Sequence, residues 1–299
     1  MNTNSTQGKI LVTGATGNVG GAVAMELVSR GVSVRALVRD ESRAVGLAGA
    51  GVEIVVGDMD VPETLDAALS GVRAVFLATS ANPNSTAQVR RVIDAALRAD
   101  KPHVVRLGAA APAADGPILG RMHAESDSDL AGSGLPYTLL RPSSFMQNAM
   151  MAAPSVISEG AIYMPFKNGR LGLIDVRDLA ECAVIALTGD GHEGKTYTLT
   201  GPDSISYYDV ASALSDAIGK EVKYIDIPLE ACREALTGMG LDGWTANAYV
   251  EYFDLFGRNG YDFTTDEVEE LTGRTPRSIS QFAADFAGAF GAETADLGA

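Results

Sequence analysis

The most informative part of this sequence is a glycine-rich turn that follows a short apolar run near the amino terminus. Run and turn together are Lys9-Ile10-Leu11-Val12-Thr13-Gly14-Ala15-Thr16-Gly17-Asn18-Val19-Gly20. Gly14 permits a tight turn, Gly17 lets the backbone approach a pyrophosphate, and Gly20 lets the next helix pack closely on the strand. A helix that begins there directs unpaired N–H groups and its positive dipole end at phosphates. We therefore predict that this turn binds a dinucleotide.

Three glycines alone are weak evidence in a chain that has 33 of them, and a purely structural turn is the alternative. The surrounding pattern supplies the missing context, because short β-branched runs alternate with stretches of helical spacing. The expected strands are residues 9–12, 32–38, 52–56, 74–78, 103–107 and 137–141, and the clearest helix covers 86–100. This alternation predicts an α/β protein, an NAD(P)-binding Rossmann fold with a doubly wound parallel sheet.

The second half of the chain has a looser rhythm. Strands are expected at 171–176, 196–200 and 222–227, and helices at 177–188, 206–218, 243–256, 265–271 and 278–290. We expect residues 8–150 to form the Rossmann domain and residues 151–290 a smaller C-terminal α/β substrate lobe, interleaved with the first. Residues 291–299 are expected to form a flexible tail. The lobe should cap the carboxyl ends of the strands, where open α/β sheets bind ligands.

Composition excludes several classes of protein. The chain has 299 residues, 46% of them hydrophobic, and 23 basic against 38 acidic residues give a net charge of −15. Such an acidic chain is a poor binder of nucleic acid or anionic membranes, and its apolar stretches are shorter than the ~20 residues of a membrane span. The polar start does not resemble a secretory signal, and two cysteines, Cys182 and Cys232, are expected as buried, unoxidised thiols. We expect a cytoplasmic protein without a metal site, and a homodimer is left open.

Charge at the end of the second predicted strand indicates which dinucleotide is bound. An acidic side chain there would bind the ribose of NAD and repel a 2′-phosphate. This chain instead has Arg39, with Arg43 one helical turn later, and a guanidinium makes strong paired contacts with a phosphate. NADP(H) is therefore preferred. NAD(H) is the alternative, because a shift of one residue would make Asp40 the ribose ligand; Arg35 is expected to point elsewhere.

The other expected cofactor contacts follow from their places in the fold. Asp58 and Met59 come after the third strand and would flank the adenine, and Ala78 and Thr79 come after the fourth. The complete predicted set is Gly14, Thr16, Gly17, Asn18, Val19, Gly20, Arg39, Asp58, Met59, Ala78 and Thr79.

Several segments resemble the NmrA-like family of atypical short-chain dehydrogenases/reductases. They are residues 13–20, 34–39, 133–148, 174–180 and 271–278. The similarity runs from about Lys9 to Phe290, and the nearest branch is that of the type-2 NAD(P)H:quinone oxidoreductases. The resemblance implies an NADPH-dependent oxidoreductase that transfers hydride to a quinone or related aromatic carbonyl. The family also contains redox sensors, so a non-catalytic NADP(H)-sensing regulator with a protein partner stays open, as does a biosynthetic ketone or enone reductase.

The catalytic groups of ordinary short-chain dehydrogenases are missing from this chain. These enzymes use a serine after the fifth strand and a Tyr-x-x-x-Lys pair on the next helix, but here Gly108-Ala109-Ala110-Ala111 follows the strand and the helix has no such pair. It has His123 and Asp127 on one helical face, and the quinone reductase branch similarly tends to carry His then Glu there. A carboxylate beside an imidazole raises its pKa, so His123 is the candidate catalytic acid. A pair that joins helix to sheet is the alternative.

The missing acids also bear on the substrate. A plain ketone needs its developing alkoxide stabilised, whereas a reduced quinone is a less basic phenolate and needs less help. After the sixth strand, Phe145 would stack on a flat ring and Asn148 would donate to a carbonyl. The rest of the expected pocket wall is Met146, Met150, Met151, Met164, Pro165 and Phe166. A core patch between the two lobes is the alternative for this segment, because methionines usually fill cores.

Overall fold

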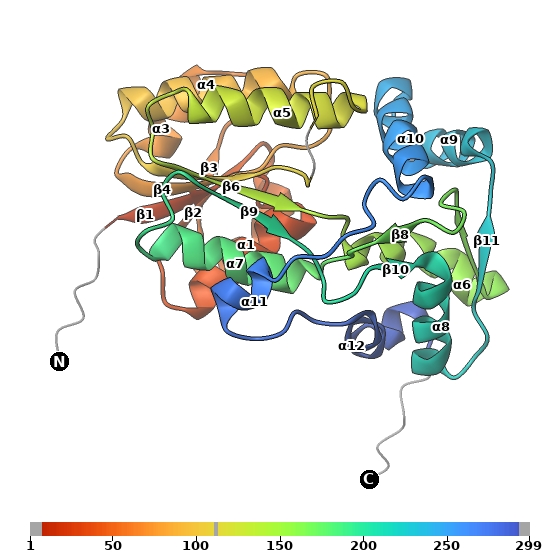
Figure 1. The fold of residues 1–299 in the computed structure, drawn as a ribbon. Coiled ribbons are helices and arrows are strands. Elements are labelled where there is room, and N and C mark those ends of the chain that lie inside the picture. The colour runs from red at the N-terminus through yellow and green to blue at the C-terminus, as the bar shows by residue number, and fades with distance from the viewer. Residues whose placement is uncertain (1–7, 111–112, 293–299) are drawn as a thin grey trace, which may run out of the picture. The chain divides into compact units, whose positions relative to one another are not determined.

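The computed structural model describes residues 8–110 and 113–292 (Figure 1). The polar start, Ala111 and most of the expected tail, residues 293–299, therefore lie outside the described part. The chain divides into two compact units. The first unit comprises the chain up to Gly116, Gly120–Pro142 and Leu179–Thr198, and the second comprises Pro117–Leu119, Ser143–Asp178 and the chain from Leu199.

A seven-stranded sheet in the order β3-β2-β1-β4-β5-β6-β9 forms the centre of the first unit. Its strands are β1 Lys9–Val12, β2 Val34–Val38, β3 Glu53–Val56, β4 Val72–Leu77, β5 His103–Leu107, β6 Tyr137–Pro142 and β9 Lys195–Leu199. Each pairing from β3 across to β6 is parallel. The order reverses at β1, which has β2 on one side and β4 on the other. This topology confirms the predicted doubly wound α/β fold.

Helices cover both faces of this sheet (Figure 1). Figure 1 shows α3, α4 and α5 on one face and α1 and α7 on the other. The helices are α1 Asn18–Ser29, α2 Val45–Gly49, α3 Glu63–Leu69, α4 Ser85–Arg98, α5 Ile118–Ala131 and α7 Val176–Thr188, with a 3₁₀ turn, η1, at Glu41–Ala44. Coverage on both faces explains why β2 and most of β4 are buried residue after residue.

Helix α4 confirms the helix expected at residues 86–100. Its apolar face, which includes Val89, Val92 and Ile93, packs into the core beneath the sheet. Each such aliphatic side chain contributes about 1.5–3 kcal/mol when it is fully buried. Ion pairs from Arg90 to Glu125 and Asp129 join α4 to α5, so α5 is held against the same face. Cys182 and Cys232 are both buried, as predicted.

The second unit is built from short elements. They are η2 Met146–Ala152, α6 Ala153–Glu159, β7 Ala161–Met164, β8 Arg170–Leu171, β10 Ile205–Ser206, α8 Tyr207–Ile218, β11 Lys223–Asp226, α9 Leu229–Gly238, α10 Gly243–Gly257, α11 Glu267–Thr272, α12 Ile279–Asp285 and η3 Ala287–Phe290. Two small sheets are present: β8 pairs antiparallel with β10, and β7 pairs parallel with β11. The sequence did not predict β7, β10, α6 or α9.

An aromatic cluster forms the core of the second unit. The Phe166 ring lies 4.7 Å from that of Tyr207, 5.1 Å from that of Phe253 and 5.6 Å from that of Phe256, measured between centroids. Only 3% of Phe166 is exposed. The expectation that Phe166 lines a pocket is therefore wrong, because Phe166 is part of the core of the second unit. Met164 is buried as well, at the end of β7.

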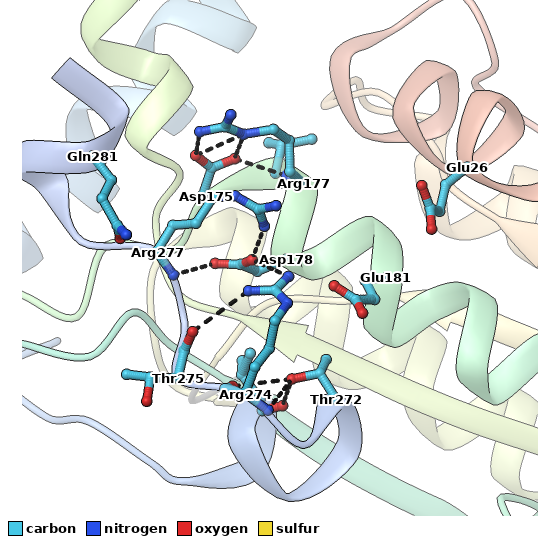
Figure 2. A network of polar contacts seen from close by, with 12 residues as sticks. Glu26, Asp175, Arg177, Asp178, Glu181, Thr272, Arg274, Thr275, Arg277 and Gln281 are labelled. Atoms are coloured by element: carbon cyan, nitrogen blue, oxygen red, sulfur yellow. Dashed lines mark hydrogen bonds and ion pairs between the residues drawn. The ribbon is translucent and has the colours of Figure 1, made fainter. Parts of the chain in front are cut away.

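A network of buried carboxylates fixes the start of α7 (Figure 2). Asp178 accepts hydrogen bonds from the Arg274 Nη2 and the Arg277 backbone N–H, both at 2.7 Å, and pairs with the Arg277 guanidinium. Asp175 accepts from the backbone N–H of Arg177 at 2.8 Å and also binds its guanidinium. Both carboxylates are fully buried. The segments 174–180 and 271–278, quoted above for the family resemblance, therefore meet in this network.

The same network corrects one predicted strand. The sequence predicts a strand over 171–176, but β8 ends at Leu171 and α7 begins at Val176. The Asp175 side chain bonds the N–H of the residue two positions later, which is a local hydrogen bond that favours a turn or helix start over an extended strand.

Replacing Asp178 should destabilise the second unit. Asp178→Asn keeps the shape but removes the charge that two arginines bind, and these arginines are about one-third exposed. We expect the free energy of unfolding to fall by about 2 kcal/mol, measured by urea denaturation. Asp285→Asn, which removes a half-exposed partner of Arg177, should cost less than about 1 kcal/mol. Equal losses in the two variants would contradict this account.

Candidate functional site

Thr13 joins the two central strands at the point where the strand order reverses. Its backbone N–H donates to the Phe76 carbonyl at 3.0 Å. Its hydroxyl donates to the Ala78 carbonyl and accepts from the Ala78 N–H, both at 2.8 Å. In open α/β sheets ligands bind at such a switch point, beyond the carboxyl ends of the strands. The glycine turn follows β1, and Ala78 and Thr79 follow β4, so both segments lie at this switch point.

Gly14 and Gly20 are required by the fold itself. Gly14 has a φ of +63°, a left-handed conformation that favours glycine, and a Cβ on Gly20 would lie 2.3 Å from the Gly14 carbonyl oxygen. Gly17 differs, because its Cβ would meet only that oxygen, at 3.3 Å. A side chain at Gly17 would thus need only a small shift of this oxygen, so the protein itself constrains Gly17 less than Gly20. A close approach by a ligand gives a further reason to exclude a side chain there.

The first turn of α1 is suited to an anion. The N-cap residue is Gly17, which has no side chain to cap the helix, and the first turn contains no acidic residue. The positive end of the helix dipole is therefore left without a local negative charge. Thr16, Asn18 and Val19 lie in the same segment, and Val19 is buried while Thr16 and Asn18 are exposed. This geometry fits a pyrophosphate held by backbone amides.

Arg39 stands at the end of β2 and is exposed. Within the part of the chain that the structure describes, its guanidinium makes no hydrogen bond or ion pair. Asp40, the competing ribose ligand, accepts from the N–H of Ser42 at 2.9 Å and from its hydroxyl at 2.7 Å. These hydrogen bonds hold the pKa of Asp40 below its usual value. One carboxylate oxygen is thus already used to cap η1, which favours Arg39 as the group that meets the cofactor.

Arg35 is a structural residue, as expected. It is buried in β2 and donates to the carbonyls of Ala68 at 2.9 Å and Ser70 at 2.8 Å, at the carboxyl end of α3. It also pairs with Glu53 at 3.0 Å. Because a helix end presents unsatisfied carbonyls, a buried guanidinium there serves the fold and not a ligand.

The loop after β3 is tied to its neighbours. The Gly57 N–H donates to the Val38 carbonyl at 2.9 Å, which brings the ends of β2 and β3 together. Asp58 accepts from the Asp60 N–H at 2.9 Å, and Met59 packs against the core. Both are partly buried. Their predicted place beside the adenine stays a prediction.

His123 is partly buried and lies in a charged cluster, with a buried Arg106 and Asp127, that the sequence did not predict. Arg106 of β5 pairs with Asp127, and its Nη2 lies 3.2 Å from the Nδ1 of His123. Arg141 of β6 donates to the other oxygen of Asp127 at 2.9 Å. Both oxygens of Asp127 are therefore engaged by arginines.

The expectation that Asp127 raises the pKa of His123 is wrong. Burial and the neighbouring Arg106 guanidinium lower the pKa of His123 to about 3. Spacing of four residues does place Asp127 on the same helical face, but two guanidinium groups compete for its carboxylate and take it. His123 is thus a neutral imidazole at neutral pH. Arg106, His123, Asp127 and Arg141 together are called the cluster below.

The cluster occupies the space beside the end of β5, where ordinary short-chain dehydrogenases carry a serine. A Cβ on Gly108 would lie 3.1 Å from the Arg106 Nη1 and 3.4 Å from an Asp127 oxygen. A signal for the cluster was present in the sequence, because Arg106 and Arg141 interrupt two apolar strands. A charge in a strand buried on both faces requires a buried partner.

Phe145 and Asn148 lie in the second unit, whereas the glycine turn and the cluster lie in the first. Phe145 forms a bridge with Ile174, and the Asn148 side-chain amide donates to the Ser144 hydroxyl at 3.1 Å. Both side chains are partly buried. Their contact with a substrate stays a prediction.

Residues 6–283 match the NmrA-like family. The chain belongs to this family. It is 39% identical over 284 residues to an NAD(P)H azoreductase from Xenophilus azovorans, and the aligned residues cover 95% of this chain and 99% of the relative. It is 36% identical over 287 residues to a (4-alkanoyl-5-oxo-2,5-dihydrofuran-3-yl)methyl phosphate reductase from Streptomyces griseus, covering 95% and 100%.

A solved structure resembles most of the chain. It is the NADPH-dependent quinone oxidoreductase QOR2 of Escherichia coli in complex with NADPH, with a TM-score of 0.81, 26% identity and coverage of 93% of this chain and 99% of that one. The resemblance to the NmrA-like family, noted above from five segments, is thereby confirmed.

Among residues 8–110 and 113–292, no helix is both long and apolar enough to cross a membrane. Nor do three or more His, Cys, Asp or Glu side chains gather there in a way that would hold a metal ion.

A side chain at Gly20 should damage both the fold and cofactor binding. Gly20→Ala forces α1 away from the Gly14 carbonyl, and we expect a loss of about 1–3 kcal/mol in stability and at least about tenfold weaker NADPH binding. Thermal unfolding and calorimetric titration measure the two effects. Gly49→Ala, in a helix with open space around it, is the control and should be neutral or slightly stabilising. Unchanged NADPH affinity in Gly20→Ala would refute the assigned site.

Proposed function

We propose that this protein transfers hydride from NADPH to a quinone or a related electron-poor aromatic acceptor. The protein belongs to the NAD(P)H-dependent oxidoreductases and uses NADP(H). The azoreductase and the quinone oxidoreductase among its relatives support this class. The observation that carries the proposal for this chain is the uncapped glycine turn at the switch point, next to β2, which is followed directly by the exposed Arg39.

We assign the cofactor to residues of the first unit. Backbone amides of the turn would hold the pyrophosphate, and the Arg39 guanidinium would bind the 2′-phosphate. Asp58 and Met59 would flank the adenine, and Ala78 and Thr79 would lie below the cofactor. The full assigned set is Gly14, Thr16, Gly17, Asn18, Val19, Gly20, Arg39, Asp58, Met59, Ala78 and Thr79.

The proposed reaction needs little acid from the protein. NADPH supplies a hydride when it is bound, and the acceptor takes that hydride and one proton from water to give a hydroquinone. The anion that forms first is a phenolate, which is stabilised by hydrogen bonds without immediate protonation. His123 is the proposed catalytic residue, Phe145 the ring contact and Asn148 the carbonyl contact. A cytoplasmic location and a homodimer stay predictions.

A second candidate is reduction of an activated ring alkene in a biosynthetic pathway. It is favoured by the reductase from Streptomyces griseus, whose named substrate carries an oxo and an alkanoyl group on a dihydrofuran ring. Such a ring is electron-poor, as a quinone is, and also gives a stabilised anion after hydride addition. Both candidate reactions therefore require the site to stabilise a conjugated anion after hydride addition.

Turnover with a panel of acceptors separates these functions. NADPH oxidation is followed with a benzoquinone, a naphthoquinone, an azo dye, a cyclic enone and a plain cyclic ketone. We expect turnover with the quinones and none with the ketone, and preference for the enone would favour the second candidate. If no acceptor is reduced although NADPH binds tightly, the proposal fails and the cofactor-sensing regulator becomes the better account.

Arg39 should control the preference between the two cofactors. Arg39→Ala removes a charge-assisted contact, so NADPH affinity should fall about tenfold to a hundredfold while NADH affinity stays within about twofold. Binding constants from calorimetry with both cofactors test this. Arg258→Ala, an exposed arginine on the second unit, is the control for a general loss of positive charge. Equal losses for NADPH and NADH would show that Arg39 does not meet the 2′-phosphate.

A further inference from the structure

The contact between Arg106 and His123 fixes where the imidazole carries its proton. The Arg106 Nη2 lies 3.2 Å from the His123 Nδ1. A guanidinium has donors only and keeps its charge at all accessible pH values. Nδ1 must therefore be the acceptor in this hydrogen bond, and the single proton of the neutral ring must be on Nε2.

We infer that Arg106 is a positioning residue that holds His123 as the neutral Nε2–H tautomer, so that His123 donates a hydrogen bond to the acceptor and does not supply its proton. This inference rests on the proposed function, because it assigns the role of His123 in that reaction. In this role His123 is not an acid that titrates near neutral pH. It is a hydrogen-bond donor whose protonation state does not change around neutral pH.

Arg106 is itself held in place. Only 2% of its side chain and 4% of that of Asp127 are exposed, and the two form an ion pair. Asp127 also binds Arg141, so the carboxylate is fixed from two strands, β5 and β6. The absence of a side chain at Gly108 leaves room for this arrangement. Rotation of Arg106 away from His123 would separate a buried ion pair, which is costly.

The other states of the ring are excluded by the same neighbours. The Nδ1–H tautomer would point its N–H at a guanidinium, which has no acceptor to receive it. The doubly protonated ring would add a cation to a cluster that already has two guanidinium groups and one carboxylate. Arg106 from β5, Arg141 from β6 and Asp127 from α5 are the charged groups of this cluster, and their sum is +1. Burial first, and the Arg106 charge second, lower the pKa of His123.

A neutral imidazole N–H suits the proposed acceptor. Negative charge develops on the acceptor as hydride arrives, and an oriented donor stabilises that charge in the transition state. The product anion of a quinone is weakly basic, so its proton can arrive later from water. A neutral histidine used in this way is known from other enzymes, where the imidazole polarises a carbonyl.

Nitrogen-15 NMR of the imidazoles tests the tautomer without any assay of activity. The chain has three histidines, and the signals lost in His123→Gln assign the ring. We expect the pattern of a neutral Nε2–H imidazole, unchanged between pH 5 and 8. A ring that titrates near pH 6.5, or the Nδ1–H pattern, would overturn the inference. In Arg106→Met the hydrogen bond to Nδ1 is lost, so the Nδ1–H pattern should appear and the pKa of His123 should rise, whereas Arg106→Lys, which keeps a charged donor, should retain the wild-type pattern. If Arg106→Met does not fold, the wild-type spectrum decides alone.

Two substitutions at His123 test the role of the N–H in turnover. Glutamine offers an amide N–H close to the place of Nε2–H but is no acid, so His123→Gln should keep kcat with a quinone within about fivefold, while His123→Ala should lose about a hundredfold. His192→Gln, at a histidine outside the cluster, is the control and should leave kcat unchanged. Equal and large losses for glutamine and alanine would favour an acid and refute the donor. If no acceptor is reduced by the wild type, the proposed function fails, and NMR still decides the Arg106–His123 contact.

Discussion

The first unit depends on one backbone contact, the approach of the first turn of α1 to the carbonyl of Gly14. A single carbon atom at Gly20 would lie 2.3 Å from that oxygen, so helix and strand pack without any side chain between them. Thr13 fixes the base of the turn to β4 through three hydrogen bonds. The contact between Gly20 and the Gly14 carbonyl also places the uncapped backbone amides of α1 at the switch point. Under the proposed cofactor assignment, a side chain at Gly20 therefore affects stability and binding together. They are separable at Gly17, where a side chain meets less of the protein.

Buried charges are the second constraint on this molecule. Each buried arginine in the sheet is met by a group from a distant part of the chain: Arg35 by the carboxyl end of α3, and Arg106 by Asp127 of α5. In the second unit, Asp178 is met in the same way by Arg274 and Arg277. Removing one partner from such a pair leaves an uncompensated charge, so these contacts restrict which elements can lie together.

Local patterns predicted the sheet and most helices, because burial on two faces imposes apolar runs and helix faces impose a spacing. They predicted β11 but not its partner β7, which lies about 60 residues earlier in the sequence and carries an exposed Tyr163 opposite an exposed Ile225. Phe166 was misplaced for a related reason, because an aromatic residue in a loop gives no sign of the partners that bury it. His123 and Asp127 show the limit most clearly. Their spacing gave correct proximity, but only the fold brings Arg106 and Arg141 into competition for the carboxylate.

The absent acids and the neutral imidazole lead to the same kind of chemistry. An enzyme that reduces plain ketones must hold a group that protonates or strongly stabilises an alkoxide. This chain has glycine and alanine where the serine would stand, and burial together with the Arg106 guanidinium lowers the pKa of its one candidate imidazole. Such a site can orient a hydrogen bond but cannot quickly supply a proton from the ring. The acceptors it suits are those whose reduced anion persists in water long enough to be protonated by solvent, and conjugated ring carbonyls meet that requirement where isolated ketones do not.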